Sequence, residues 1–133
     1  MGTRSRIGIE LPDGKVMSVY CHWDGYPSYN GKILLEHYQN ADKVMQLISN
    51  GDMSTLGPEI GSKHDFNARN TDMCTFYGRD RGEAGVEAAT HTSAAEMHTE
   101  EYSYLFKNGK WYYCDGYKDP TNFELLTLEK CKD

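Results

Sequence analysis

The stretch Tyr20-Cys21-His22-Trp23-Asp24-Gly25-Tyr26-Pro27-Ser28-Tyr29-Asn30-Gly31 governs how this chain folds, because a strand pattern changes into a helix pattern within it. Gly25 and Pro27 predict a turn, and Asn30 is suited to cap the helix that follows. Backbone N–H groups at a strand-to-helix junction can hold an anion. The aromatic, carboxylate and hydroxyl side chains gathered here therefore indicate a ligand site, with a packed core turn as the alternative.

The residues before this junction alternate between apolar and polar on both sides of a Pro-Asp-Gly turn at 12–14. Such period-two patterning predicts a β-hairpin over residues 3–23. A hairpin brings its two ends together whatever the register, so Arg4 and Arg6 are expected to lie beside the His22–Asp24 end of the partner strand.

The residues after the junction have helical spacing, which predicts two short helices over residues 31–39 and 42–50, the second capped by Asp42. Residues 52–70 are rich in Gly, Ser, Asn and Asp and read as a long loop. The segment 78–83 reads as a glycine-flanked turn.

The dipeptide Asn108-Gly109 favours a type I′ turn and predicts a second hairpin over residues 102–114. This turn pairs Phe106 with Trp111 and Tyr104 with Tyr113. We therefore expect residues 1–133 to form a single domain of the α+β class, with an antiparallel β-sheet and two short helices packed on one face.

The composition excludes several classes of protein. The formal net charge of −6 argues against a nucleic-acid polymer as partner, because such partners need a basic face. No apolar run approaches the roughly 20 residues of a membrane helix, and the N-terminus lacks the apolar region of a secretion signal. We expect no membrane contact and a cytoplasmic location with reduced cysteines. The Cys and His spacings match no zinc pattern, so we expect no metal or cofactor; a metal site assembled by the fold is the alternative.

The five arginines of the chain fall in two segments, Arg4–Arg6 and Arg69–Arg81. Arginine is the residue best suited to forked recognition of phosphate or carboxylate. An acidic chain with its arginines gathered in this way favours a small anion in a pocket over a long polyanion. The alternative is that the arginines pair with neighbouring carboxylates.

Three motifs carry a resemblance: Gly2-Thr3-Arg4-Ser5-Arg6-Ile7, Ser18-Val19-Tyr20-Cys21-His22-Trp23-Asp24-Gly25-Tyr26-Pro27-Ser28, and Phe76-Tyr77-Gly78-Arg79-Asp80-Arg81-Gly82-Glu83. In them the chain resembles a family of short phage-encoded proteins. Small phage proteins of this size include sponges that sequester nucleotide immune signals, such as the Sequestin and Lockin proteins that act against Thoeris defence. The resemblance implies an anti-defence protein in the cytoplasm of an infected bacterial host.

We expect the ligand to be a small nucleotide-derived signal, an ADP-ribose derivative made by a TIR-domain enzyme, which the protein sequesters without turnover. Such a ligand needs N–H donors for its pyrophosphate, an aromatic ring for its base and a carboxylate for ribose hydroxyls. The candidate ligand-binding residues are Arg4, Arg6, Arg79 and Arg81 for phosphate, Trp23, Tyr26 and Tyr77 for the base, Asp24 and Glu83 for ribose, and His22 beside them.

Two other functions stay open. A phosphodiesterase that cleaves a cyclic nucleotide signal could use His22 as acid or base and Asp24 to orient it. The paired H-x-[ST] motifs of two-histidine phosphodiesterases are not present, since a single match occurs at residues 91–93, and we expect no catalytic residue. A protein-binding inhibitor of a host enzyme would instead display its aromatic side chains as a flat exposed patch. The ten tyrosines suggest more apolar surface than a small monomer exposes, and predict a homo-oligomer.

Overall fold

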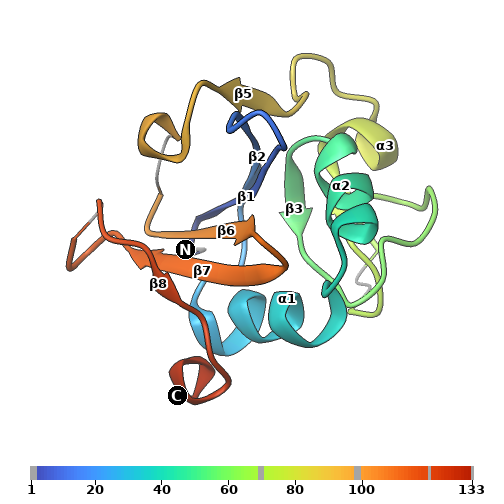
Figure 1. The fold of residues 1–133 in the computed structure, drawn as a ribbon. Coiled ribbons are helices and arrows are strands. Elements are labelled where there is room, and N and C mark those ends of the chain that lie inside the picture. Colours follow the sequence, from blue (N-terminus) through green and yellow to red (C-terminus); the bar gives the residue numbers. More distant parts are fainter. Residues whose placement is uncertain (1–2, 69–70, 98–99, 120, 133) are drawn as a thin grey trace.

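The protein is built on one mixed β-sheet. The computed structural model describes residues 3–68, 71–97, 100–119 and 121–132. The strands are β1 (Ser5–Glu10), β2 (Val16–Cys21), β3 (Met53–Thr55), β4 (Thr75–Phe76), β5 (Ala89–His91), β6 (Tyr102–Lys107), β7 (Lys110–Asp115) and β8 (Glu124–Leu125). They lie in the order β4-β3-β2-β1-β6-β7-β8, and β5 pairs with β2 off this path (Figure 1).

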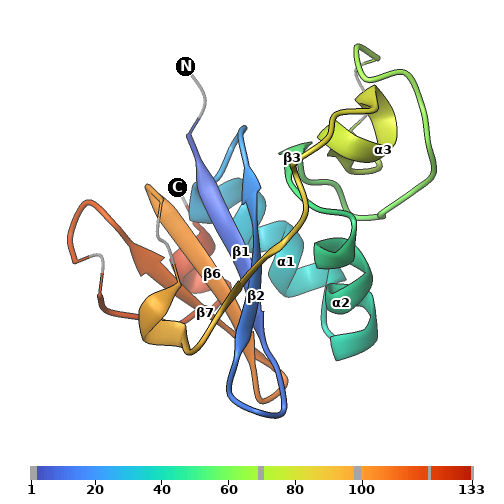
Figure 2. The same cartoon turned by 90° about the horizontal axis from the view of Figure 1, so that it is seen from above.

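Short helices complete the fold. They are α1 (Lys32–His37), α2 (Ala41–Ser49) and α3 (Tyr77–Arg81), with a π-helical turn at Pro27–Gly31 and 3₁₀ turns at Ala94–Glu96 and Glu129–Cys131. The helices α1 and α2 lie together on one side of the sheet, and α3 lies beyond β3 (Figure 2). The α+β class and the packing of the two predicted helices on one face are confirmed.

Both predicted hairpins are present. β1 and β2 are antiparallel, with Ile7 opposite Val19. β6 and β7 are antiparallel, with Phe106 opposite Trp111 and Tyr104 opposite Tyr113, the pairs that the Asn-Gly turn predicts. The sheet as a whole is not purely antiparallel, because β6 lies parallel to β1 and β3 lies parallel to β2. Parallel neighbours need long connections between them. Residues 22–52 connect β2 to β3, and residues 11–101 separate β1 from β6.

The core lies between this sheet and α1 and α2. Its side chains are apolar residues that alternate along β1, β2 and β6 and recur at helical spacing along α1 and α2, and the fully buried ones include Ile7, Val19, Leu34, Tyr38, Val44, Leu47, Ile48 and Tyr104. Two polar groups that enter this core are paired. Tyr38 donates its hydroxyl to Gly57 O at 2.7 Å, and Trp111 donates its indole N–H to Tyr38 O at 2.8 Å. These bonds satisfy buried groups that would otherwise destabilise the fold.

Some local predictions are wrong. Asn40, not Asp42, caps α2 by accepting a hydrogen bond from Lys43 N at 2.8 Å. Asn30 caps no helix, because its side chain is buried and donates to Trp23 O at 3.3 Å. Residues 53–55 form a strand inside the predicted loop, because β2 offers them its free edge. Residues 77–81 form a helix in place of the predicted turn, and Gly82 ends it in the left-handed conformation at φ +71°.

The face of the sheet that points away from α1 and α2, called here the second face, is divided into an apolar and a polar part. At one end Val16, Met97 and Leu105 form a small apolar cluster. Gly8 leaves room for this cluster, since a Cβ at this position would lie 2.8 Å from Met97 Sδ and 3.2 Å from Met17 O. At the other end the same face carries Arg6 opposite Tyr20. Within the described residues, the helices are all too short or too polar to cross a membrane.

Candidate functional site

The junction after β2 is held rigidly. The N–H groups of His22 and Trp23 donate to Met53 O at 3.1 Å and Ser54 O at 3.0 Å, so the strand continues beside β3 for two residues. Asp24 then turns the chain with φ at 57°, a conformation that a non-glycine residue adopts at some cost and that often occurs at functional sites. Gly25 follows, and its carbonyl accepts the Tyr104 hydroxyl at 2.7 Å.

The position of Gly25 has no room for a side chain. A Cβ on Gly25 would lie 2.7 Å from Ser5 Cβ and 2.8 Å from Thr3 O. The close approach lets Gly25 N donate to Thr3 O at 2.8 Å. The junction therefore packs against the start of β1 and leaves Trp23 40% exposed and Tyr26 37% exposed.

A pocket of about 330 Å³ opens beside Trp23. This volume is at the lower end of the range of small-molecule sites. The pocket combines two aromatic rings, one carboxylate and three hydroxyl groups, and its lining residues are Trp23, Asp24, Ser54, Thr55, Phe66, Ala68 and Thr75. One oxygen of Asp24 accepts the Tyr26 hydroxyl at 3.2 Å. Two of the predicted ligand residues thus line a pocket, and a third positions one of them.

An aromatic stack continues the pocket wall behind Phe66. The rings of Phe66 and Tyr77 lie 5.6 Å apart, and the Arg81 guanidinium lies 4.5 Å from the Phe66 ring and 4.8 Å from the Tyr77 ring. Cation–π contacts of this kind are favourable by roughly 0.5–1 kcal/mol at exposed sites. Tyr77 and Arg81 therefore support the pocket wall from α3, and Glu83 pairs with Arg81 at 3.0 Å on the surface.

The polar part of the second sheet face lies on the other side of Trp23. Arg6 donates to Ser18 Oγ at 2.9 Å, and this hydroxyl also contacts His91 Nε2 at 3.0 Å. The Tyr20 hydroxyl lies 2.7 Å from His22 Nδ1. Burial raises the pKa of Tyr20, and the neighbouring Arg4 guanidinium opposes this shift.

The Arg6 guanidinium on this polar face is only partly satisfied. Its Nε is buried and has no hydrogen-bond acceptor among the residues that the structure describes. An unpaired buried donor destabilises the fold. The carboxylate of Asp52 accepts a hydrogen bond from Tyr20 N at the same face. Burial raises the pKa of this carboxyl group, and the Tyr20 N–H and the Arg6 guanidinium oppose the shift.

The polar face and the pocket are connected through two side chains. The His22 and Trp23 rings meet edge to face at a centroid distance of 4.8 Å, and the Tyr20 and His22 rings lie 5.9 Å apart. A path of touching side chains thus runs from Arg4 and Tyr20 to the pocket. The predicted residues Arg4, Arg6, His22, Trp23, Asp24 and Tyr26 lie along this path, and Tyr77 and Arg81 reach it through Phe66.

Arg79 does not lie with them. Its guanidinium donates to Ile60 O at 2.8 Å, to Cys74 O at 2.9 Å and to the Asp80 carboxylate at 3.0 and 3.2 Å. These bonds engage all three nitrogens. The side chain is 15% exposed and stacks on Phe76 at 4.7 Å. The structure therefore gives Arg79 a structural role in place of the predicted contact with phosphate.

Sequence reasoning missed Ser54, Thr55, Phe66 and Thr75, which line the pocket. The first three lie in the segment 52–70 that the composition assigned to a loop. Phe66 gave a usable signal, because a single aromatic residue within a polar stretch needs a packing partner.

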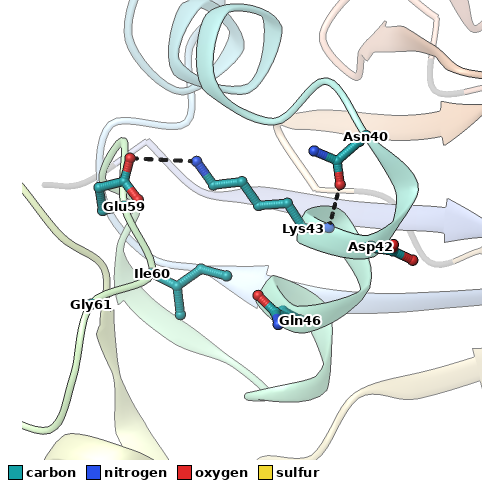
Figure 3. Close-up of a pocket in the computed structure, with 7 residues that line it drawn as sticks. All are labelled: Asn40, Asp42, Lys43, Gln46, Glu59, Ile60 and Gly61. Carbon is teal, nitrogen blue, oxygen red and sulfur yellow. Dashed lines mark hydrogen bonds and ion pairs between the residues drawn. The ribbon is translucent and has the colours of Figure 1, made fainter.

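A second hollow of about 540 Å³ lies beside α2 (Figure 3), between Lys43, Gln46 and Glu59. Lys43 is the cation among its lining residues, and its Nζ donates to His37 O at 2.7 Å and Pro58 O at 3.0 Å. The same ammonium group lies 4.5 Å from the Tyr38 ring. Because the ammonium group of Lys43 is already bound to these two carbonyl oxygens, this hollow is a weaker candidate for an anionic ligand.

The side chains of the site are poorly suited to nucleophilic catalysis or to metal binding. Burial raises the pKa of the Cys21 thiol to about 12, so this cysteine stays protonated and unreactive. His22 contacts Tyr20, while Asp24 accepts from Tyr26, so the two are not arranged as a hydrogen-bonded pair. Among the described residues, no three His, Cys, Asp or Glu side chains are grouped to hold a metal.

Comparisons with known proteins gave no match, whether against family models, curated proteins or solved structures.

Proposed function

We propose that this protein binds and sequesters a small nucleotide-derived signal, an ADP-ribose derivative, without turning it over. The observation that carries the proposal is the pocket in which Trp23 and Phe66 face a ligand together with the Asp24 carboxylate. Aromatic rings bind a base by stacking, and a carboxylate accepts hydrogen bonds from ribose hydroxyls.

The polar sheet face supports the same ligand. Arg4 and Arg6 bring two guanidinium groups beside Tyr20 and His22. A pyrophosphate at this face would be joined to a base in the pocket across the His22 ring. The carboxylates of Asp52 and Glu100 lie near Arg6 and Tyr20, so the feature that suits a small anion is the forked hydrogen bonding of the two arginines and not a net positive charge.

The role proposed for the protein is that of a phage anti-defence sponge in the host cytoplasm, which lowers the free concentration of a signal made by a TIR-domain enzyme. The motifs that the chain shares with short phage-encoded proteins motivate it. Sequestration requires tight binding and no catalytic group, which agrees with the unreactive Cys21 and with the separate partners of His22 and Asp24.

Calorimetric titration with ADP-ribose tests the proposal. We expect binding to the intact protein, and roughly five- to 150-fold weaker binding to Trp23→Ala because stacking on an aromatic ring contributes roughly 1–3 kcal/mol per base. ADP-ribose should be recovered unchanged by mass spectrometry. Tyr117→Ala is the matched control, since Tyr117 is an exposed aromatic residue outside the pocket. Equal losses in both variants would contradict the proposed site, and a cleaved product would favour the phosphodiesterase.

A protein-binding inhibitor of a host enzyme is the second candidate, because Trp23 and Tyr26 are both more than a third exposed. Absence of ADP-ribose binding, together with capture of a host enzyme that Trp23→Ala abolishes, would favour it.

We also propose that the protein is a homo-oligomer, most simply a dimer. Leu125 and Leu128 are exposed by 43% and 54%, and exposed apolar surface of this kind is often covered by a second copy. Light scattering at micromolar concentration should report a mass above the 15.1 kDa of one chain. A single species of that mass would overturn the expectation.

A further inference from the structure

The buried end of the pocket contains a hydroxyl group with a fixed hydrogen-bond polarity. Thr75 is 4% exposed and lines the pocket from β4. Its Oγ1 lies 3.1 Å from His64 Nε2. What this hydroxyl can offer to a ligand depends on which of the two atoms carries the hydrogen between them.

The other nitrogen of the His64 ring settles the question. Nδ1 lies 2.9 Å from Ser62 O, and a carbonyl oxygen can only accept, so Nδ1 carries the proton. The Asp80 carboxylate, 3.6 Å from Nδ1, favours the same arrangement. In the neutral ring Nε2 is then an acceptor, and the hydrogen between the two side chains belongs to Thr75.

Thr75 therefore has only lone pairs left for the pocket. Its hydroxyl hydrogen points at His64, and the oxygen can accept from a ligand but cannot donate to it. His64 itself is held in place, because its backbone N–H donates to Asp80 Oδ1 at 3.1 Å and its side chain is 14% exposed. Asp24, at the outer part of the pocket, is a carboxylate and also accepts only.

We propose that Thr75 makes the pocket selective for a base that carries its hydrogen-bond donor at position 6, an adenine rather than a hypoxanthine ring, and that His64 is the positioning residue that fixes this preference. Trp23 and Phe66 line the same pocket as Thr75, so the flat base is assigned to these three residues and the ribose to Asp24. Adenine presents an amino donor at position 6, and hypoxanthine presents an oxygen acceptor there. This inference rests on the proposed function and names the side chains that select the adenine of the ligand.

Binding of AMP and IMP, measured by calorimetry, tests the inference. We expect the intact protein to bind AMP at least roughly fivefold more tightly than IMP, because the position-6 oxygen of IMP and the Thr75 oxygen would be two acceptors facing each other. Thr75→Val should lower AMP binding and bring the ratio of the two affinities close to one, and Thr75→Ser should keep the ratio. Thr55→Val is the matched control, since Thr55 lies opposite Thr75 in the same pocket; it should leave the ratio unchanged.

His64→Ala separates positioning from stability. Without the ring, the Thr75 hydroxyl can rotate and donate, so the affinity for IMP should rise while that for AMP stays the same or falls. A merely structural role would lower both affinities together. Equal binding of AMP and IMP by the intact protein would overturn the selectivity and leave the nucleotide pocket standing, whereas absence of binding by either nucleotide and by ADP-ribose would overturn both proposals.

Discussion

The two sides of α3 differ sharply although they carry the same residue type. Arg79 lies on the inner side, 15% exposed, with its guanidinium bonded to two carbonyls and to Asp80. Arg81 lies on the outer side, 47% exposed, with its guanidinium against the rings of both Phe66 and Tyr77. Residues two apart on a helix do not face each other. The pair cannot splay around one phosphate once this segment is helical, so a repeated residue in a motif does not imply a repeated role.

The carboxylate of Asp80 explains why the inner side is fixed. It accepts hydrogen bonds from Phe76 N at 2.8 Å, from His64 N at 3.1 Å and from Arg79. One buried side chain thus ties together β4, the loop that carries Phe66 and the helix itself. The outer side carries Arg81 and Glu83, an exposed ion pair, and stays available to a ligand.

The largest loss of stability is expected when the contacts on the inner side of α3 are removed. Arg79→Ala should lower the free energy of unfolding by about 3–5 kcal/mol, because it leaves a buried carboxylate without its charged partner. Urea denaturation followed by fluorescence measures the change. A loss below about 1 kcal/mol would mean that Arg79 is not a structural residue, and would return it to the ligand site.

The dependence of stability on pH should report Asp80 separately. Burial alone would raise its pKa, but the hydrogen bonds from Arg79, Phe76 and His64 hold the pKa below its usual value in the folded protein. A carboxyl group with a lowered folded-state pKa stabilises the fold above its unfolded pKa, about 3.9, and this contribution disappears as the pH falls through the folded-state value.

Asp80→Asn tests the contribution of this charge. The variant should be less stable than the intact protein at pH 7, and the difference in unfolding free energy should shrink as the pH is lowered from about 4 to 2. A difference that stays constant over this range would show that the charge of Asp80 does not contribute.

The smallest change in stability is expected on the outer side. Arg81→Ala removes an exposed ion pair and two exposed cation–π contacts, and should cost less than about 1.5 kcal/mol in urea denaturation. If Arg81 also reaches the pyrophosphate, the same variant should bind ADP-ribose about tenfold more weakly. A strongly destabilised Arg81→Ala with unchanged binding would reverse the roles of Arg79 and Arg81.

Patterns along the chain were enough to predict the parts of the fold that depend on local contacts. Alternating residues around the turn at 12–14 and the Asn108-Gly109 turn specify two hairpins, and helical spacing specifies α1 and α2. Patterning therefore sufficed for the α+β class and for the proximity of Arg6 to the end of β2, where it lies opposite Tyr20.

The remaining segments take their structure from contacts with distant parts of the chain. β3 is a strand because β2 presents a free edge to it, and residues 77–81 form a helix where Asp80 binds the N–H of Phe76 and the side chain of Arg79. Trp23, Phe66 and Thr75 come from separate segments and meet only when β3 and β4 join the sheet. Contacts between residues so distant in sequence depend on the packing of the whole chain, and a pattern read along the sequence cannot show them.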